Sequence, residues 1–239
     1  FYVPPHYLLE RSTKSMYYHQ LQTNVRQYNL ACSLDTYLQL AMLAFQADNG
    51  LKFMLSNEKQ PLSSFEPAHY FPPRLLQDFP DLSHLMRLVR QHYDHFKNLP
   101  SGVARFRFIQ LACKPTSNFN QHLFSLPAMK QKHFGVFLGL TPHGFTIHQQ
   151  PSDHWISCTK SIPWTEVTLL TCKKRTVTVH LKTKHDQYEF LFTKTMYARH
   201  MHELAIQMKF HQLRAAMVAP RSAWTLNDLD CGPYEERNC

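Results

Sequence analysis

Apolar residues in the first half of the chain recur every three to four positions, a spacing that predicts amphipathic helices. One such stretch begins near Ser12, and a second follows Ser33, which is a typical N-cap residue. A third stretch follows another N-cap residue, Asp81, and a fourth begins near Ser101. Four amphipathic helices cannot bury their apolar stripes alone, so residues 12–115 are expected to form one helical bundle.

The predicted ends of these helices come from residues that interrupt regular structure. Asn49 and Gly50 tolerate the left-handed conformation and are expected to close the second helix, while Leu99–Pro100 closes the third. The stretch 51–80 contains five prolines and is expected to be a loop, with a single helical turn at Arg74–Asp78.

The spacing of apolar residues changes to two in the second half of the chain, which predicts β-strands. A turn-rich tetrapeptide, Thr141–Gly144, separates two strands of one hairpin, and the basic segment Lys173–Arg175 separates two more. A long helix is expected over Lys194–Val218. Antiparallel strands followed by one long helix outline a β-sandwich that is capped at an open corner. The predicted strands are Phe134–Leu140, Phe145–His148, Val167–Cys172, Thr176–Lys182 and Tyr188–Phe192.

The composition fits a folded protein with an anionic partner. Of the 239 residues, 44% are hydrophobic and 13% aromatic, which excludes intrinsic disorder for the bulk of the chain. The formal net charge is +9, and because the last twenty residues carry two arginines and four acids, the rest of the chain carries +11. A basic body of this kind favours acidic lipid head groups or nucleic acid as a partner.

Sequence motifs for catalysis are missing from the chain. It contains no GxSxG, P-loop, HExxH or GxGxxG motif, and six glycines leave little material for a phosphate-binding loop. The six cysteines show no CxxC spacing, which points to a reducing, intracellular setting. We therefore predict no enzyme activity, no cofactor and no metal site. Close histidine pairs arise by chance among 16 histidines: His92 with His95, His180 with His185, and His200 with His202.

With no motif for catalysis, the sequence favours a binding function. A sandwich strand without a neighbour beside the terminal helix offers backbone N–H and C=O groups, so an extended peptide can add there as one more strand. Apolar helix residues such as Leu204 and Met208 either line that groove or seal the sandwich core. Nucleic-acid binding ranks last: Arg105–Phe108 alternates cations and aromatic rings, but a helix spreads these residues around its axis, and Phe108 is expected to face inward.

The order of these elements and several local motifs resemble the FERM domain of the band 4.1, ezrin, radixin and moesin family. Leu40–Ala47 is similar to the family's Leu-Ala-x-Leu-Ala-x-Gln-Ala segment, and Met16–Leu21 to the aromatic-rich opening of its first middle-lobe helix. Leu138–Phe145 resembles a hairpin of its third lobe, and Ile162–Val167 followed by Lys173–Lys174 resembles its Pro-Trp…Lys-Lys signature. Each match is weak alone, but their order across most of the chain is specific.

The resemblance implies an α+β multidomain fold, in which an all-α, acyl-CoA-binding-protein-like helical bundle precedes a PH/PTB-like β-sandwich capped by a C-terminal helix. Residues 1–10 would be the last strand of a truncated ubiquitin-like lobe, and residues 11–118 the helical middle lobe. Residues 119–218 would be the PH/PTB-like lobe, and residues 219–239 a mobile tail.

The function that the resemblance implies is that of an adaptor. Such a module docks the cytoplasmic tails of membrane receptors or adhesion proteins at the inner face of the plasma membrane. It links the membrane to the cytoskeleton or to signalling complexes. Acidic phosphoinositides bind some members between the first and third lobes, so a chain with almost no first lobe holds at most half of such a site.

The candidate site residues follow from the resemblance by position. In the family, tail peptides add to the strand after the Pro-Trp motif and pack on the terminal helix. The basic turn formed by Lys173, Lys174 and Arg175 is the candidate lipid contact. The implied peptide-binding residues are Val167, Thr168, Leu169 and Leu170 on the strand, and Leu204, Met208 and His211 on the helix.

Two departures from the family pattern limit what the resemblance implies. Asp48–Leu51 stands where the family has Phe-Gly-Asp-Tyr, and the acidic actin-binding tail of the ezrin group is not visible, so actin binding is not predicted. FERM lobes also precede tyrosine kinase and phosphatase domains. A regulatory module of such an enzyme stays open as an alternative, because this sequence would look the same in both cases.

Overall fold

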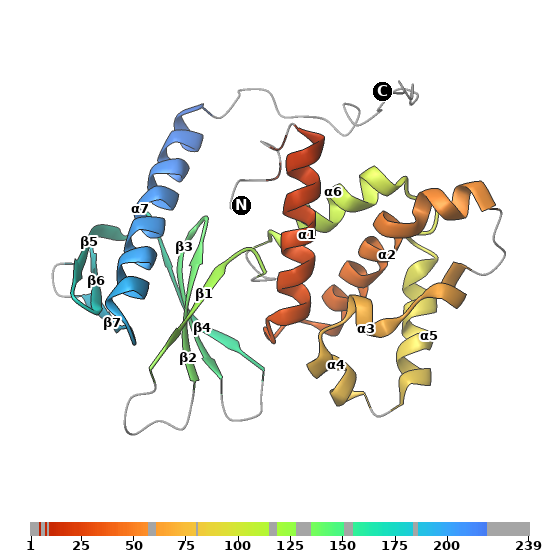
Figure 1. The fold of residues 1–239 in the computed structure, drawn as a ribbon, viewed down its shortest axis with the longest axis horizontal. Helices are drawn as coiled ribbons and strands as arrows, with labels where there is room; N and C mark the ends of the chain where they lie inside the picture. Colours follow the sequence, from red (N-terminus) through yellow and green to blue (C-terminus); the bar gives the residue numbers. More distant parts are fainter. Residues whose placement is uncertain are drawn as a thin grey trace.

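The computed structural model describes residues 5, 8, 10–56, 61–79, 81–114, 119–127, 135–150, 155–183 and 186–218. A helical lobe and a β-sandwich stand side by side, and the sandwich carries a long C-terminal helix (Figure 1). This arrangement is the predicted α+β architecture. The predicted strand at 1–10 and the predicted mobile tail at 219–239 lie outside the described residues, apart from Pro5, Leu8 and Glu10.

The helical lobe contains longer helices at its start and end and shorter ones between them. The N-caps predicted at Ser33 and Asp81 are confirmed: Ser33 Oγ accepts from the backbone N–H of Thr36 at 3.2 Å, and Asp81 Oδ1 from that of Ser83 at 2.8 Å. The first helix begins one residue before Ser12, with Glu10 as its N-cap, so the cap expected at Ser12 or Thr13 is not found. The third predicted helix ends earlier than expected, at its last buried tyrosine rather than at Leu99–Pro100. The elements are α1 (Arg11–Gln27), α2 (Leu34–Ser56), a 3₁₀ turn (Pro61–Ser64), α3 (Pro67–Tyr70), α4 (Pro73–Asp78), α5 (Leu82–Tyr93) and α6 (Ser101–Ala112).

The second helix does not stop at Asn49–Gly50, so that prediction is wrong. The Asn49 amide nitrogen donates to the Phe45 carbonyl of the same helix at 3.1 Å and to the Tyr70 hydroxyl of α3 at 3.3 Å, so it is held inside the lobe instead of capping the helix. A Cβ at Gly50 would lie 2.7 Å from Nε2 of Gln46, and that amide donates to the Leu99 carbonyl at 2.8 Å. Gly50 therefore makes room for a side chain that holds the loop before α6.

The proline-rich stretch is more helical than predicted. The expected turn at Arg74–Asp78 is confirmed as α4, and two further helical turns precede it. Each turn begins at a proline. The first residue of a helix makes no intrahelical hydrogen bond through its N–H, so proline, which lacks this group, is well suited to that position. Phe65 and Phe71 are buried between these turns, and the Phe65 ring lies 5.2 Å from that of Phe45 on α2. Aromatic packing thus ties this stretch to the core of the lobe.

The sandwich consists of a four-stranded sheet in the order β1-β2-β3-β4 and a three-stranded sheet in the order β5-β6-β7. Its core lies between the sheets and under α7, where Leu138, Val177 and Met201 are fully buried. The sequence did not predict β1 or β4. The strands are β1 (His122–Leu126), β2 (Gly135–Thr141), β3 (Gly144–Gln150), β4 (Ser157–Pro163), β5 (Val167–Lys173), β6 (Thr176–Leu181) and β7 (Gln187–Leu191), followed by α7 (Thr195–Val218).

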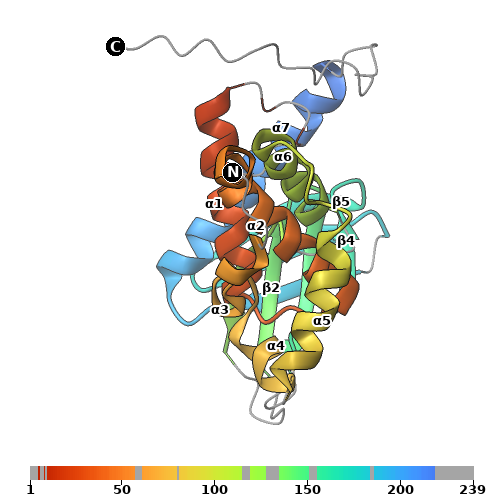
Figure 2. The same ribbon diagram turned by 90° about the vertical axis from the view of Figure 1, so that its right-hand side faces the viewer.

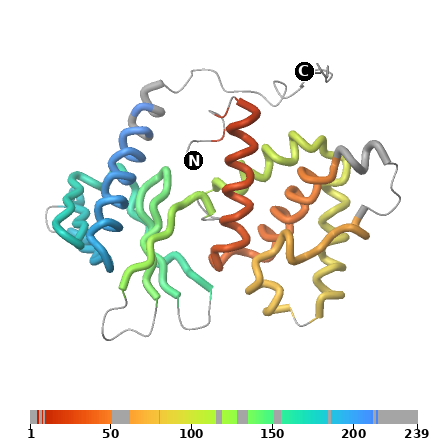
Figure 3. The backbone as a smooth tube through the Cα atoms, in the orientation of Figure 1, coloured from red at the N-terminus to blue at the C-terminus, as the bar shows by residue number. Residues whose placement is uncertain are grey.

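The two lobes share polar and apolar contacts. Helix α1 lies between the sandwich and the rest of the helical lobe (Figure 3), and in the turned view the helices stand in front of the first sheet (Figure 2). Ile156 pairs with the segment before α2: its N–H donates to Asn29 O at 2.7 Å, and its carbonyl accepts from Ala31 N–H at 2.8 Å. The lobes are therefore joined by backbone as well as side-chain contacts.

A buried polar cluster lies on the face of the first sheet opposite the sandwich core. His148 Nε2 lies 3.0 Å from Gln121 Oε1 and 2.9 Å from Thr146 Oγ1. Burial lowers the pKa of His148 to about 4, so its ring is neutral at pH 7. The cluster fits against Gly139 of β2, where a Cβ would lie 2.1 Å from the Gln121 oxygen. A side chain at this position would displace the cluster.

Candidate functional site

Strand β5 forms an edge of the second sheet, because β6 is its only neighbour in the order β5-β6-β7. Helix α7 packs against β5 and β6 and runs beside this edge (Figure 1). The pairing register places Lys173 opposite Thr176 across a two-residue turn, and Thr171 opposite Thr178. Because hydrogen-bonded pairs alternate in an antiparallel ladder, the backbone groups of Leu170 and Cys172 point away from β6, toward the open edge.

Two side chains of α7 reach carbonyl oxygens of β5. Lys209 Nζ donates to the Val167 carbonyl at 2.8 Å, and His202 Nε2 lies 3.3 Å from the Leu170 carbonyl. The two residues are seven positions apart, which places them on the same face of the helix two turns from each other. Sequence reasoning missed both residues, although this spacing beside Leu204 and Met208 is a signal that points to them.

Four of the predicted peptide-binding residues come together in the structure. Val167 and Met208 are buried in the sandwich core, while Leu170 and Leu204 are half-buried and pack against the same core cluster. These side chains form an apolar wall under the β5 edge. The name β5–α7 groove is given to the edge of β5 together with His202, Lys209 and this wall, the candidate peptide site.

The other three predicted peptide-binding residues do not join the apolar wall: Thr168 lies in a β-bulge, and Leu169 and His211 are exposed. A β-bulge between Val167 and Leu169 inserts Thr168 as an extra residue, and its hydroxyl donates to the His180 carbonyl at 3.0 Å. The bulge turns Leu169 outward, so 54% of this residue is exposed instead of lying on the face of Val167. His211 is exposed on α7.

The basic turn between β5 and β6 is exposed. Lys174 adopts a positive φ of 54°, as a tight hairpin turn requires. The Arg175 carbonyl accepts from the backbone N–H of Phe192 at 2.8 Å, which places the turn beside the start of α7. Met196 and Tyr197 in the first turn of α7 are 64% and 43% exposed, so apolar and cationic side chains share this end of the sandwich.

The thiols with shifted pKa values are poor nucleophiles. Burial raises the pKa of Cys113 to about 11, and burial also raises the pKa of Cys32 and of Cys158. In the part of the chain that the structure describes, no three His, Cys, Asp or Glu side chains are placed to hold a metal ion. None of the described helices combines the length and apolar character needed to cross a membrane.

The segment Arg105–Phe108, considered above for nucleic-acid binding, contributes Phe108 to the core of the helical lobe, while Arg107 is exposed. Phe108 is 1% exposed, and its ring lies 5.1 Å from that of Tyr18, so the expectation that it faces inward is confirmed. The guanidinium of Arg105 lies 5.3 Å from the centre of the Tyr18 ring. These contacts support a structural role for the segment.

An all-α lobe followed by a β-sandwich with a C-terminal helix defines the class of a multilobed α+β module. The family model described as the FERM central domain matches residues 3–124, just over half of the chain. The chain belongs to the FERM family. This assignment confirms the resemblance that the motifs indicated.

Proteins of similar sequence carry further domains. Human tyrosine-protein phosphatase non-receptor type 13 is 23% identical over 229 residues, which is 95% of this chain but 9% of that protein. The mouse FERM and PDZ domain-containing protein 2 is 23% identical over 234 residues, 95% of this chain and 16% of that protein. The chain thus spans a small part of the curated relatives that it matches.

Solved FERM structures share the fold. The FERM and C-terminal domain complex of Drosophila Merlin has a TM-score of 0.66 at 12% identity, covering 90% of this chain and 70% of that one. The MyTH4-FERM domain of human myosin 7b, in complex with the harmonin-a PDZ3 domain, has a TM-score of 0.58 at 13% identity. That match covers 84% of this chain and 38% of the myosin chain.

Proposed function

We propose that this chain is a FERM-type adaptor that binds the cytoplasmic tails of membrane proteins by adding an extended peptide to β5. The module would also contact an anionic membrane surface and so link the membrane to the cytoskeleton or to signalling complexes. Its place would be the cytoplasmic side, at the inner face of the plasma membrane. The family assignment and the partner complexes named for Merlin and myosin 7b support a binding role.

The observation that carries the proposal is the β5 edge beside an apolar wall. The backbone groups of Leu170 and Cys172 point toward this edge, and the half-buried side chains of Leu170 and Leu204 lie under it. Backbone hydrogen bonds would give a peptide its affinity, and the wall would select its side chains. An incoming strand would replace the contacts of His202 and Lys209 with the carbonyls of β5.

Membrane contact is supported by the exposed basic turn. Lys173, Lys174 and Arg175 present cations beside the exposed Met196 and Tyr197. Basic side chains attract anionic lipid, and apolar side chains next to them enter the head-group region. Phosphoinositides are one class of acidic lipid that such a surface would attract.

A direct test of strand addition uses the backbone of Cys172. A panel of fluorescent peptides from the tails of membrane receptors and adhesion proteins is first screened against the unchanged chain. Cys172→Pro removes an N–H that faces the open edge, and Cys172→Ala is the control that changes the side chain alone. We expect the proline variant to lose at least about ten-fold in affinity, with the alanine variant close to the original. No binding across the panel, or equal loss in both variants, contradicts the proposal.

A second test addresses the apolar wall. Leu170→Asp places a charge against the half-buried wall and is expected to weaken peptide binding by about 1–3 kcal/mol. Leu82→Asp makes the same change at a residue of α5 that is 52% exposed, and we expect no effect on binding. Thermal unfolding of both variants reports whether the fold is retained.

One observation favours a second candidate function, a targeting module within a larger tyrosine phosphatase. The similarity to phosphatase non-receptor type 13 extends over 95% of this chain. In such a protein the groove would direct the catalytic domain to its substrates. Sequencing the full-length transcript decides between the two, because a phosphatase domain encoded downstream is required by this alternative.

A further inference from the structure

Helix α7 carries apolar side chains on the face that points away from the sandwich core. Its core face is formed by Ala198, Met201 and Ala205, which are fully buried. Met196 and Phe210 are 64% and 63% exposed and lie on the opposite side of the helix axis from those residues. The outer face of a surface helix is usually polar, so two large apolar side chains there indicate a contact surface.

The exposed apolar residues belong to a regular stripe along four turns of α7. Its five residues are separated alternately by three and four positions, the spacing at which two helices pack against each other. Ile206 is half-buried, so part of its side chain faces outward. Figure 1 shows α7 along the sandwich and apart from the helical lobe. The outer stripe consists of Met196, Arg199, Glu203, Ile206 and Phe210.

The two charged residues of the outer stripe are available to a partner. Arg199 and Glu203 are exposed, and neither forms an ion pair within the part of the chain that the structure describes. They stand four positions apart with the arginine nearer the N-terminus, which is the less favourable order for pairing within one helix. An ion pair with another helix would therefore displace no existing ion pair.

The order of these charges selects the orientation in which two copies of α7 can pack. In a parallel pair, Arg199 would meet Arg199 and Glu203 would meet Glu203, so like charges would repel. In an antiparallel pair centred midway between the two residues, Arg199 of each copy meets Glu203 of the other. The same register sets Met196 opposite Ile206 of the second copy, again twice. A register with Met196 opposite Phe210 would bring the two Glu203 carboxylates together, which disfavours it.

We propose that the outer stripe is a homodimer interface, at which α7 packs antiparallel against α7 of a second copy. The occupant is a second copy because the stripe is complementary to itself about a two-fold axis, both in its charges and in its apolar positions. This inference does not depend on peptide binding in the β5–α7 groove.

The proposed dimer is weak. One pair of helices buries less surface than the roughly 1,600 Å² of a standard interface. Each copy also carries a net charge of +9, which opposes association. We expect a Kd of about 10–100 µM. At about 1 µM the chain is then monomeric, so measurements of stability and peptide binding at that concentration report on the single chain.

Sedimentation velocity of the whole chain between about 5 and 500 µM tests the dimer. Arg199→Glu and Glu203→Arg should each raise the Kd by at least about ten-fold, because each sets like charges opposite one another at two positions. The variant with both substitutions exchanges the charges and should dimerise like the unchanged chain. An equimolar mixture of the two single variants should form heterodimers, since each then supplies the charge that the other lacks.

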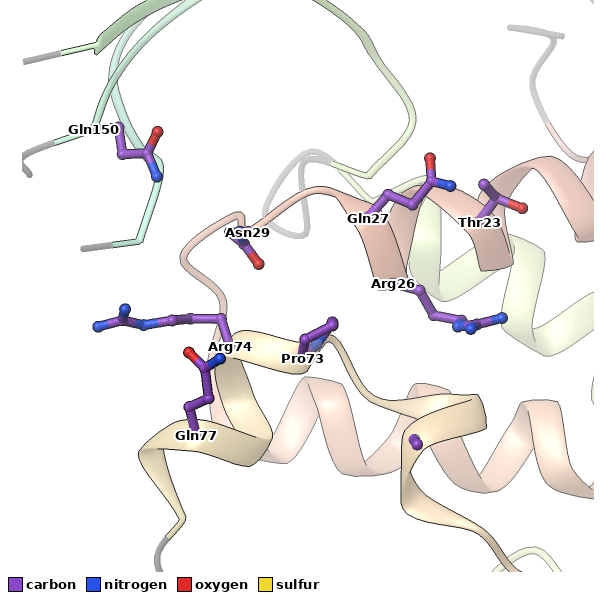
Figure 4. Close-up of a pocket in the computed structure, with 9 residues that line it drawn as sticks. Thr23, Arg26, Gln27, Asn29, Pro73, Arg74, Gln77 and Gln150 are labelled. Carbon is purple, nitrogen blue, oxygen red and sulfur yellow. The ribbon is translucent and has the colours of Figure 1, made fainter. Parts of the chain in front are cut away.

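Two further variants separate the stripe from the net charge and the fold. Arg26→Glu makes the same charge reversal at the polar cleft between the lobes, which Arg74 and Gln150 also line (Figure 4). We expect this variant to change the Kd by less than about two-fold. Met196→Gln replaces an apolar side chain that is already exposed, so it should raise the Kd by about five-fold without lowering the unfolding temperature.

Three outcomes overturn the proposal. The first is a chain that stays monomeric at about 500 µM, and the second is equal weakening of the dimer by Arg26→Glu. The third is a double variant that does not recover the association lost in the single variants. That result would mean that the outer stripe packs against a different surface of the second copy.

Discussion

Lys209 of α7 donates a hydrogen bond from its ammonium group to the backbone carbonyl of Val167 on β5, at 2.8 Å. The donor comes from the terminal helix, and the acceptor stands where the edge strand begins. The contact ties the helix to the strand and occupies a carbonyl that faces the β5–α7 groove. The proposed peptide binding and the stability of the sandwich would therefore be linked through this one residue.

Replacing Lys209 by methionine keeps the aliphatic stem and removes the ammonium. We expect the free energy of unfolding in urea to fall by about 1 kcal/mol, because the Val167 carbonyl loses its donor. Peptides that bind in the groove should bind a few-fold more tightly, since that carbonyl becomes available. Arg199→Met on the exposed face of the same helix is the control. Unchanged stability in Lys209→Met would contradict the role given to this contact.

The basic turn is tested with phosphatidylserine-containing vesicles. Replacing Lys173 and Lys174 by glutamine should weaken vesicle binding by about five-fold for each residue, because a cation near an anionic surface contributes about 1 kcal/mol. Cosedimentation measures the bound fraction, and the difference should shrink as salt increases. Arg87→Gln with Arg90→Gln makes the same charge change on α5. If this control pair weakens vesicle binding as much, the net charge of the protein and not the basic turn is responsible.

Gly139 is predicted to be intolerant of a side chain. A Cβ there would lie 2.1 Å from Gln121 Oε1 and 2.2 Å from Thr146 Oγ1, so Gly139→Ala should lower the unfolding free energy by about 2–3 kcal/mol. Gly102 in α6 has no atom within 4 Å of the corresponding Cβ position. Gly102→Ala should therefore change stability by less than about 1 kcal/mol, in the stabilising direction. Similar destabilisation by both alanines would contradict the packing described here.

The neutral state of His148 predicts a dependence of stability on pH. The unfolded ring binds a proton below about pH 6.5, while the folded ring stays neutral down to a pKa of about 4. The free energy of unfolding should therefore fall as the pH is lowered from about 6.5 to about 4. At the lower end of this range, His148 alone should account for a loss of about 3 kcal/mol. Urea unfolding at pH 7, 6 and 5 should show a shallower decline for His148→Gln. An equal decline of the unfolding free energy in both proteins would rule out a buried, neutral His148 as the cause.

Most elements followed from local spacing along the chain. The terminal helix was predicted over Lys194–Val218 and spans Thr195–Val218, and the hairpin around Thr141–Gly144 joins β2 to β3 as expected. Strand β4 was missed because five of its seven residues are exposed, so its sequence lacks the alternation that marks a strand. Strand β1 is five residues long and gives an equally weak signal.

The candidate groove was only partly predictable. The apolar wall of Leu170, Leu204 and Met208 came from the family resemblance, and these side chains do pack together. His202 and Lys209 were not predicted as groove residues, since a polar side chain on a helix is usually solvated. Their role becomes visible only when the carbonyls of β5 are placed beside them.

The sequence by itself determined the longer helices, five of the seven described strands and the long helix that follows them, because the period of apolar residues is a local property. Only the tertiary structure decided that a bulge at Thr168 turns Leu169 outward, and that α2 continues through Gly50. It also decided that Arg26 and Arg74 line one cleft. These features depend on contacts between residues distant in sequence, and the spacing of apolar positions carries no record of such contacts.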